Sequence, residues 1–161
     1  MLLPKFDSSA VFCKIIDEKI GGSFKIEVDK SYTITQHYLN NTAILKTNFR
    51  NNENEFEVLD FMTRFKLDDK NFYNPPELQR MIRPLRGLPK IKVLYNPTLE
   101  YANGKTKTYK KEDFIVSVFE EASYETLFLY TDIEKKKILE NKEFELAEPV
   151  YLNLSYNEKI D

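Results

Sequence analysis

Residues 90–109 read K-I-K-V-L-Y-N-P-T-L-E-Y-A-N-G-K-T-K-T-Y and carry the clearest strand and turn signals of the chain. Residues 90–95 alternate apolar and polar side chains, which is the period of a half-buried strand. Asn103-Gly104 stands between two further alternating arms, and this dipeptide favours a two-residue type I′ turn. The stretch therefore predicts a strand from residue 90, followed by a β-hairpin over residues 98–109.

The same alternation predicts strands elsewhere in the chain. Residues 24–28 and 32–38 alternate, Asn40-Asn41 favours a tight turn, and residues 42–49 can return as the partner strand. Further strands are predicted over residues 56–67, 114–119, 126–130, 144–146 and 150–154. Pro149 separates the last two segments, and because proline cannot donate to a ladder, one of the two is expected at a sheet edge.

Three segments fit more than one kind of secondary structure. Residues 8–21 have apolar side chains at helical spacing and also alternate; the helix is slightly favoured. Residues 56–67 favour a strand because the turn-forming Asp68-Asp69 follows at once. Residues 111–122 fit a strand over 114–119 or a helix.

Two further short helices are predicted. One begins at Asn74-Pro75-Pro76-Glu77, where proline suits the first turn, and is limited to about two turns by Pro84 and Gly87. The other begins at Asp132, which can cap its start, and runs through Glu140.

These elements predict a mainly β protein, a β-rich α+β fold in which seven to nine short strands outnumber two to four short helices. The expected architecture is a compact antiparallel barrel or sandwich, and an oligonucleotide-binding (OB-like) barrel is one concrete version. The length of 161 residues and the lack of a repeat or linker predict one domain over residues 1–161. The tail after Tyr156 is expected to be frayed.

The composition also bears on compartment and origin. The single cysteine, Cys13, excludes an internal disulfide, and a lone thiol is typical of a reducing compartment. The N-terminus lacks the pattern of a signal peptide, and no window reaches the roughly 18 apolar residues of a membrane span. We expect a soluble cytoplasmic protein. The abundance of Lys, Asn, Ile and Tyr is typical of AT-rich coding DNA, as in many low-GC bacteria, phages and plasmids.

Positive charge is concentrated in residues 80–111. They hold nine of the 24 lysines and arginines but only one of the 26 acids, in a chain of net charge −2. Cations neutralise phosphates, and interleaved tyrosines can stack on unpaired bases, so the stretch predicts a patch that binds nucleic acid, single-stranded in one version. The predicted nucleic-acid-binding residues are Arg80, Arg83, Arg86, Lys90, Lys92, Tyr95, Tyr101, Lys105, Lys107, Tyr109, Lys110 and Lys111.

Other readings of this stretch stay open. A strand with one solvent-exposed face is often rich in Lys and Thr, which keep the protein soluble. The acids that follow, Glu112-Asp113 and Glu120-Glu121, could neutralise the patch, and an acidic protein surface is a second possible partner. A structural or adaptor protein that pairs a β edge with a partner or with a second copy of itself is the alternative of a different class.

Catalytic and metal-binding patterns are missing from the sequence. Adjacent carboxylates point to opposite faces of a strand, so none forms a shared site by spacing alone. His37 and Cys13 are the only residues of their types, and there is no metal-binding motif or glycine-rich phosphate loop. The sequence therefore predicts a protein that is not an enzyme and uses no cofactor or metal.

Overall fold

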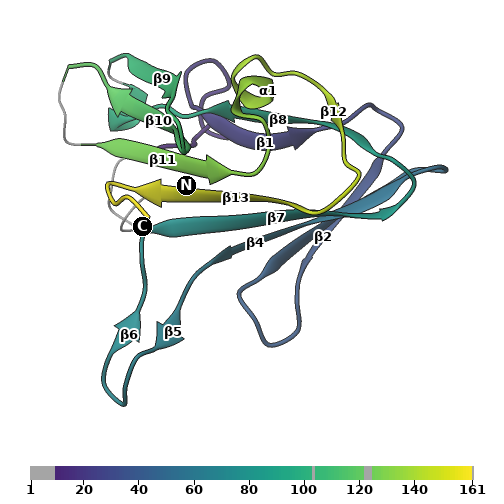
Figure 1. Cartoon of the computed structure of the whole chain (residues 1–161), viewed down its shortest axis with the longest axis horizontal. Helices are drawn as coiled ribbons and strands as arrows, with labels where there is room; N and C mark the ends of the chain where they lie inside the picture. Colours follow the sequence, from purple (N-terminus) through teal and green to yellow (C-terminus); the bar gives the residue numbers. More distant parts are fainter. Residues whose placement is uncertain (1–9, 103, 122–124, 161) are drawn as a thin grey trace.

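The computed structural model describes residues 10–102, 104–121 and 125–160, and its strands form two packed antiparallel sheets and a projecting arm (Figure 1). The large sheet has eight strands in the order β2-β3-β4-β7-β13-β11-β10-β9. Their bounds are β2 Thr33–Tyr38, β3 Leu45–Arg50, β4 Glu55–Met62, β7 Glu77–Arg86, β9 Thr106–Lys110, β10 Phe114–Phe119, β11 Thr126–Thr131 and β13 Val150–Tyr156.

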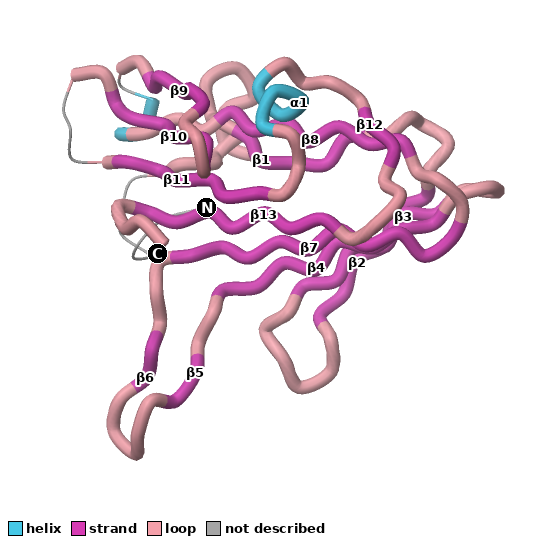
Figure 2. Tube along the Cα trace, viewed as in Figure 1, coloured by secondary structure: helices cyan, strands magenta, loops and turns pink. Residues whose placement is uncertain are grey.

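The small sheet has three strands in the order β1-β8-β12. Their bounds are β1 Ser23–Glu27, β8 Lys90–Asn96 and β12 Phe144–Glu145. Helix α1 (Lys135–Leu139) lies beside β8, and the 3₁₀-helix η1 (Glu100–Ala102) precedes β9 (Figure 2). Among the residues that the structure describes, no helix is long and apolar enough to cross a membrane.

The core lies between the two sheets. Leu129 and Leu152 of the large sheet, Ile91 and Val93 of the small sheet, and Ile138 of α1 belong to one cluster, and each is at most 1% exposed. A continuous apolar contact of this kind is what holds a sandwich together. The small sheet covers only part of the large one, because β2 at the far edge is exposed along its whole length.

Strands β5 (Phe65–Lys66) and β6 (Phe72–Tyr73) pair only with each other. They form a hairpin that projects away from both packed sheets, between the end of β4 and the start of β7 (Figures 1 and 2). We call residues 63–74 the arm.

The structure confirms a mainly β, antiparallel fold, and of the two predicted architectures it has the sandwich. The large sheet does not close into a barrel, because β2 and β9 remain as its two edges. The OB-like barrel is therefore wrong. The edge position predicted from Pro149 is confirmed, since β12 is the edge of the small sheet and β13 is central in the large one.

The short helix predicted to begin at Asn74-Pro75-Pro76-Glu77 is absent, and the segment from Glu77 to Arg86 is instead β7, the longest strand of the sheet. Pro84 seemed to limit a helix, but it sits in a strand at a bulge, where the register of β4 and β7 shifts between Glu55 and Phe56. The shift leaves Leu85 without a partner, whereas Pro84 is opposite Phe56 and lies beyond the pairing of β7 with β13, which ends at Ile82. Proline is tolerated at such irregular positions, because no regular ladder on both sides needs its missing N–H.

The predicted hairpin over residues 98–109 is also wrong in its pairing. The strand over residues 106–110 exists as β9, but it pairs with β10. Its expected partner arm is interrupted, because Glu100 and Tyr101 have φ angles of 50° and 54°, outside the β region. The turn predicted at Asn103 lies outside the described residues.

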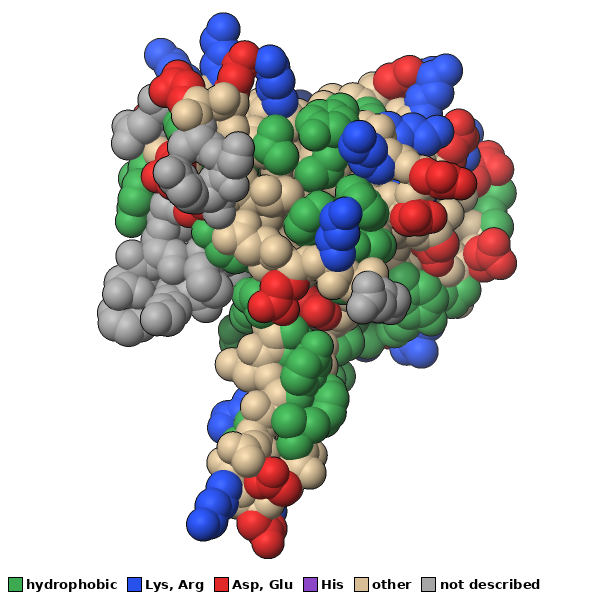
Figure 3. Space-filling view, turned by 60° about the vertical axis from the view of Figure 1, so that its left-hand side comes forward, with side chains coloured by type: hydrophobic (Ala, Val, Ile, Leu, Met, Phe, Trp, Pro, Cys, Tyr) green, Lys and Arg blue, Asp and Glu red, His purple; other side chains and the backbone are tan. Residues whose placement is uncertain are grey.

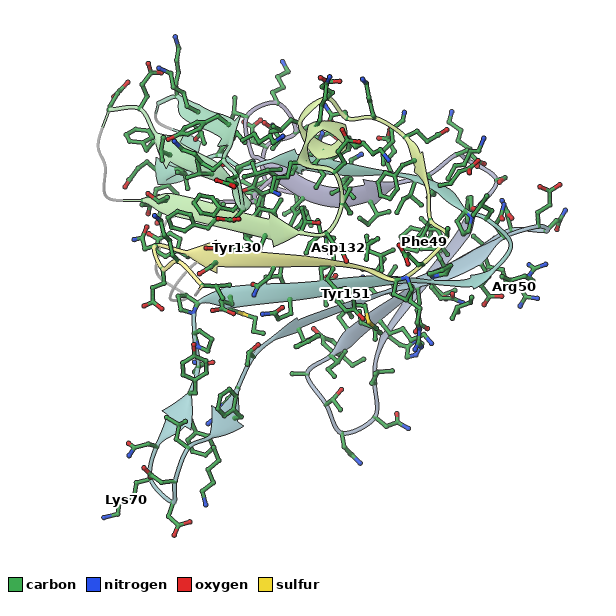
Figure 4. All side chains as sticks on the ribbon, in the orientation of Figure 1. Phe49, Arg50, Lys70, Tyr130, Asp132 and Tyr151 are labelled. Carbon is green, nitrogen blue, oxygen red and sulfur yellow. The ribbon has the colours of Figure 1, made fainter. Side chains whose placement is uncertain are left out.

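Two helix predictions need correction. From residue 10, the segment predicted as a helix over 8–21 is a loop with turns, held by the hydrogen bond from Cys13 N to Gly21 O at 2.8 Å. Helix α1 is shorter than the predicted 132–140, and Asp132 does not cap it. The Asp132 carboxylate instead accepts a hydrogen bond from the Tyr151 backbone N–H at 2.9 Å (Figure 4).

Candidate functional site

The predicted basic patch is divided between sheets and between faces. Arg80, Arg83 and Arg86 lie on β7, Lys90 and Lys92 on β8 of the other sheet, and Lys107 on β9. Successive strand residues point to opposite faces, and accordingly Arg80 points toward the small sheet while Arg83 points away from it.

Several of these cations already contact acids or carbonyl oxygens of the fold. Lys107 Nζ lies 2.6 Å from Glu120, so one of the acids that follow the basic stretch does neutralise it. Lys92 lies 3.7 Å from Glu27 and Lys90 lies 3.8 Å from Glu145. Arg86 donates hydrogen bonds to the Asn51 and Asn52 carbonyl oxygens at 2.8 and 2.7 Å. Lys105, Lys110 and Lys111 are exposed.

The three tyrosines of the prediction do not form one stacking surface. Tyr95 is only 7% exposed, packs against Phe24 in the core, and its hydroxyl accepts a hydrogen bond from Ser117. Burial raises the pKa of Tyr95. Tyr101 and Tyr109 are exposed, but Tyr101 belongs to η1 and Tyr109 to β9, where Lys111 Nζ lies 5.4 Å from its ring centre.

A buried carboxylate organises the outer face of the large sheet. The Glu57 side chain on β4 is 2% exposed and accepts from Lys46 on β3 at 2.6 Å and from Arg83 on β7. Burial alone would raise the pKa of Glu57, but the hydrogen bonds and charges of Lys46 and Arg83 outweigh it, so the pKa lies below its ordinary value of 4.5. Arg83 therefore neutralises a buried acid of the sheet.

This cluster predicts a pH-dependent stability. Because the folded-state pKa of Glu57 is lowered, its contribution is complete above the ordinary value of 4.5 and is lost as the pH falls through the folded-state value. We expect Glu57→Gln to lower the free energy of unfolding at pH 7 by about 1–3 kcal/mol and to have a smaller effect near pH 3. Urea unfolding at both pH values measures this.

The control for that prediction is Glu27→Gln. Glu27 is 40% exposed and lies 3.7 Å from Lys92, so the change should cost less than about 1 kcal/mol at either pH. An equal effect of Glu57→Gln at both pH values would contradict the assigned cause.

Arg80 joins the two sheets. Its guanidinium makes a two-point contact with Asp60 on β4, at 2.6 and 3.1 Å, and donates to the Phe24 carbonyl oxygen on β1 at 3.2 Å. It also lies over the Phe24 ring, 4.4 Å from the ring centre. Arg80 is thus a structural residue, although the sequence placed it in a binding patch.

The lone histidine and cysteine do not form a catalytic pair. His37 is exposed on the edge strand β2, where it pairs with Lys46. Cys13 lies in the loop before β1 and lines a pocket of about 330 Å³ with Ile16, Ile20 and Tyr101. Within residues 10–102, 104–121 and 125–160, no group of three or more His, Cys, Asp or Glu side chains could hold a metal ion.

The arm exposes apolar side chains away from the body of the fold. Phe65, Leu67, Phe72 and Tyr73 are 44–61% exposed, and Met62, at the base, is 47% exposed. Figure 3 shows apolar side chains along the arm and charged ones at its tip, where Figure 4 labels Lys70.

The arm corrects the prediction of one strand over residues 56–67, because Met62 ends β4 and Phe65 begins β5. The sequence does carry a signal for the arm: apolar residues on each side of Asp68-Asp69 are typical of a short hairpin with a polar turn, in which residues 72–73 form the second strand.

Most of the chain is similar to known proteins of one kind. The family model described as trehalase-like, N-terminal matches residues 1–151. Trehalase 2 of Sulfolobus acidocaldarius is 30% identical over 114 residues, which are 71% of this chain and 17% of that protein. The trehalase of Thermoplasma acidophilum is 29% identical over 139 residues, 84% of this chain and 23% of that protein. The trehalase of Thermoplasma volcanium is 30% identical over 106 residues, 64% and 16% respectively.

No solved structure matches the chain significantly. The chain spans about a fifth of the length of the curated relatives it matches. These matches overturn the prediction of a DNA- or RNA-binding protein, because the family and the relatives that match are all described as trehalase or trehalase-like. The positive charges are close together along residues 80–111, but the fold places them on strands of two different sheets. The match over residues 1–151 shows that the chain belongs to the family of trehalase-like N-terminal domains.

Proposed function

We propose that the chain is the non-catalytic N-terminal domain of a trehalase-like glycoside hydrolase, whose catalytic region lies outside these 161 residues. The observation that carries the proposal is the extent of the match. The family model covers nearly the whole chain, whereas the chain covers only 16–23% of each trehalase. Most of each relative therefore has no counterpart here.

The chemistry of the buried acids supports a non-catalytic role. Glycoside hydrolysis commonly uses two carboxyl groups, one of which has a raised pKa so that it can donate a proton. The pKa of Glu57 is lowered instead. Glu77 accepts hydrogen bonds from Gln79 and Asn153 at 3.1 and 3.3 Å.

The third buried glutamate is also held within the fold. Glu125 accepts hydrogen bonds from the Tyr156 hydroxyl at 3.0 Å and from the Glu100 backbone N–H at 3.2 Å. Burial and the nearby Glu125 carboxylate raise the pKa of Tyr156. The contacts of these three acids are with strand ends and sheet faces, as expected for structural residues.

A chimera tests the proposal. The 161-residue chain replaces the matching segment in the trehalase of Thermoplasma acidophilum, and a second protein lacks that segment altogether. We expect this chain alone to release no glucose from trehalose. We expect the chimera to be soluble and to hydrolyse trehalose, and the shortened trehalase to lose solubility or activity, because the domain supports the catalytic region.

Two results would overturn this function. One is trehalose hydrolysis by the chain alone, at a rate above that of a mock preparation made without the chain. The other is a chimera that behaves no better than the shortened trehalase.

A further inference from the structure

The arm exposes apolar side chains on both of its faces. Phe65 and Tyr73 are a cross-strand pair with ring centres 5.0 Å apart, so they share one face. Phe72 lies on the other face, where the Arg64 guanidinium carbon is 4.5 Å from its ring centre. Leu67 is 61% exposed. A projecting element with apolar groups on two sides is typical of a contact surface rather than of a solvated loop.

Local hydrogen bonds hold the turn at the tip of the arm. One Asp68 carboxylate oxygen accepts from the backbone N–H groups of Lys70 and Asn71, at 2.8 and 2.9 Å. The other accepts from the Asn71 side-chain amide at 2.8 Å, and Lys66 pairs with Asp69 at 2.7 Å. The tip is thus pre-formed and charged, while the apolar residues lie between it and the body. Pre-formation reduces the entropy lost when such an element binds.

The body of the fold gives the arm little support. Strands β5 and β6 have two residues each and pair with no other strand. An isolated two-stranded hairpin is at best marginally stable in water. A partner that covers the four exposed apolar side chains would stabilise both the pairing and the orientation of the arm.

We propose that the arm docks against the catalytic region of the trehalase-like glycoside hydrolase to which this domain belongs, with Phe65, Leu67, Phe72 and Tyr73 as the apolar contacts. This inference rests on the proposed function. Its support is the size of the relatives: about four-fifths of each matching trehalase lies outside the part that this chain covers. A large, covalently linked neighbour is therefore the occupant that the comparisons favour over a second copy of the domain.

Amide hydrogen exchange of residues 63–74 tests the docking, measured in the intact 161-residue chain and in the chimera described above. The arm amides should exchange rapidly in the chain alone, because the pairing is short and exposed. In the chimera, we expect their exchange to slow by about tenfold or more. The amides of β2, which is also exposed, serve as an internal reference and should change little.

Two variants of the chimera, matched in exposure, provide the second measurement. Phe65→Ser with Leu67→Ser removes arm side chains that are 50% and 61% exposed, and Ile34→Ser with Tyr38→Ser removes β2 side chains that are 54% and 64% exposed. The arm variant should abolish the arm protection and shorten the thermal inactivation half-life of trehalose hydrolysis about tenfold, since removal of central apolar contacts has effects of this size. The β2 variant should leave both unchanged.

The outcomes separate the two proposals. An active chimera whose arm exchanges as fast as in the chain alone would overturn the docking and leave the proposed function intact. In the isolated chain, the arm amides could instead become more protected as the protein concentration rises, with no further protection in the chimera. That result would show that the arm contacts a second copy of the domain, and it would also overturn the docking. An insoluble or inactive chimera would remove the proposed function and the docking together.

Discussion

Replacing Arg80 with methionine is expected to lower the free energy of unfolding by about 3 kcal/mol, because it leaves the Asp60 carboxylate without its partner in a nearly dry site. The two side chains are 11% and 17% exposed, which places the effect at the lower end of the range for buried pairs. The change also removes the hydrogen bond to the Phe24 carbonyl oxygen, and with it a polar link between the two sheets. Urea unfolding followed by circular dichroism at pH 7 gives the value.

Two further variants isolate the cause of the Arg80 effect. Lys90→Met breaks the exposed pair with Glu145, whose atoms are 3.8 Å apart, and should cost less than about 1 kcal/mol. Adding Asp60→Asn to Arg80→Met should recover part of the lost stability, because the uncompensated charge is gone. If Arg80→Met costs no more than Lys90→Met, the guanidinium does not link the sheets as described.

Most of the strands could be predicted from local alternation, because one face of each of them meets the core. Leu127 and Leu129 of β11, for example, are fully buried, whereas Thr126 and Tyr130 are more exposed. The same alternation hid β7, since Pro84 is a strong local signal against a regular strand. Only its tertiary position beside the irregular pairing with β4 makes that proline acceptable. A bulge is a property of two strands, so one strand's sequence does not reveal it.

The charge pattern along the sequence was the poorest guide to the surface of the folded protein. A run of cations along the chain says nothing about which face each one takes, because adjacent strand positions point in opposite directions. Nor does it say which acids become neighbours: Asp60 and Arg80 are 20 positions apart, and Glu57 and Arg83 are 26 apart. Such pairs form only when the register of β4 and β7 is set, as the pairing of Asp60 with Arg80 shows.

The candidate docking surface was hidden for a different reason. Phe65 and Leu67 read as part of a half-buried strand, and composition does not distinguish an aromatic side chain in a core from one on a projecting hairpin. The distinction depends on whether a second sheet covers the segment. In this fold the small sheet covers only part of the large one, and the arm projects away from both sheets.

That distinction can be measured by comparing a core phenylalanine with an arm phenylalanine. Phe56 is completely buried, stacks on Phe49 with ring centres 4.5 Å apart, and meets the edge of the Tyr32 ring. We expect Phe56→Ala to lower the free energy of unfolding by about 3–5 kcal/mol, because it removes a large apolar side chain and leaves a cavity. Thermal and urea unfolding of the isolated chain measure this.

Phe72→Ala on the arm is the matched change, since it deletes the same atoms from a side chain that is 51% exposed. In the isolated chain it should alter the unfolding free energy by no more than about 0.5 kcal/mol, as for ordinary surface positions. A large loss would mean that the arm is part of the cooperative core, and then its exposed rings would need no partner. A small loss for Phe72→Ala, together with a large loss for Phe56→Ala, would show that Phe72 does not stabilise the sandwich. Docking against a partner would then account for an exposed aromatic ring at this position.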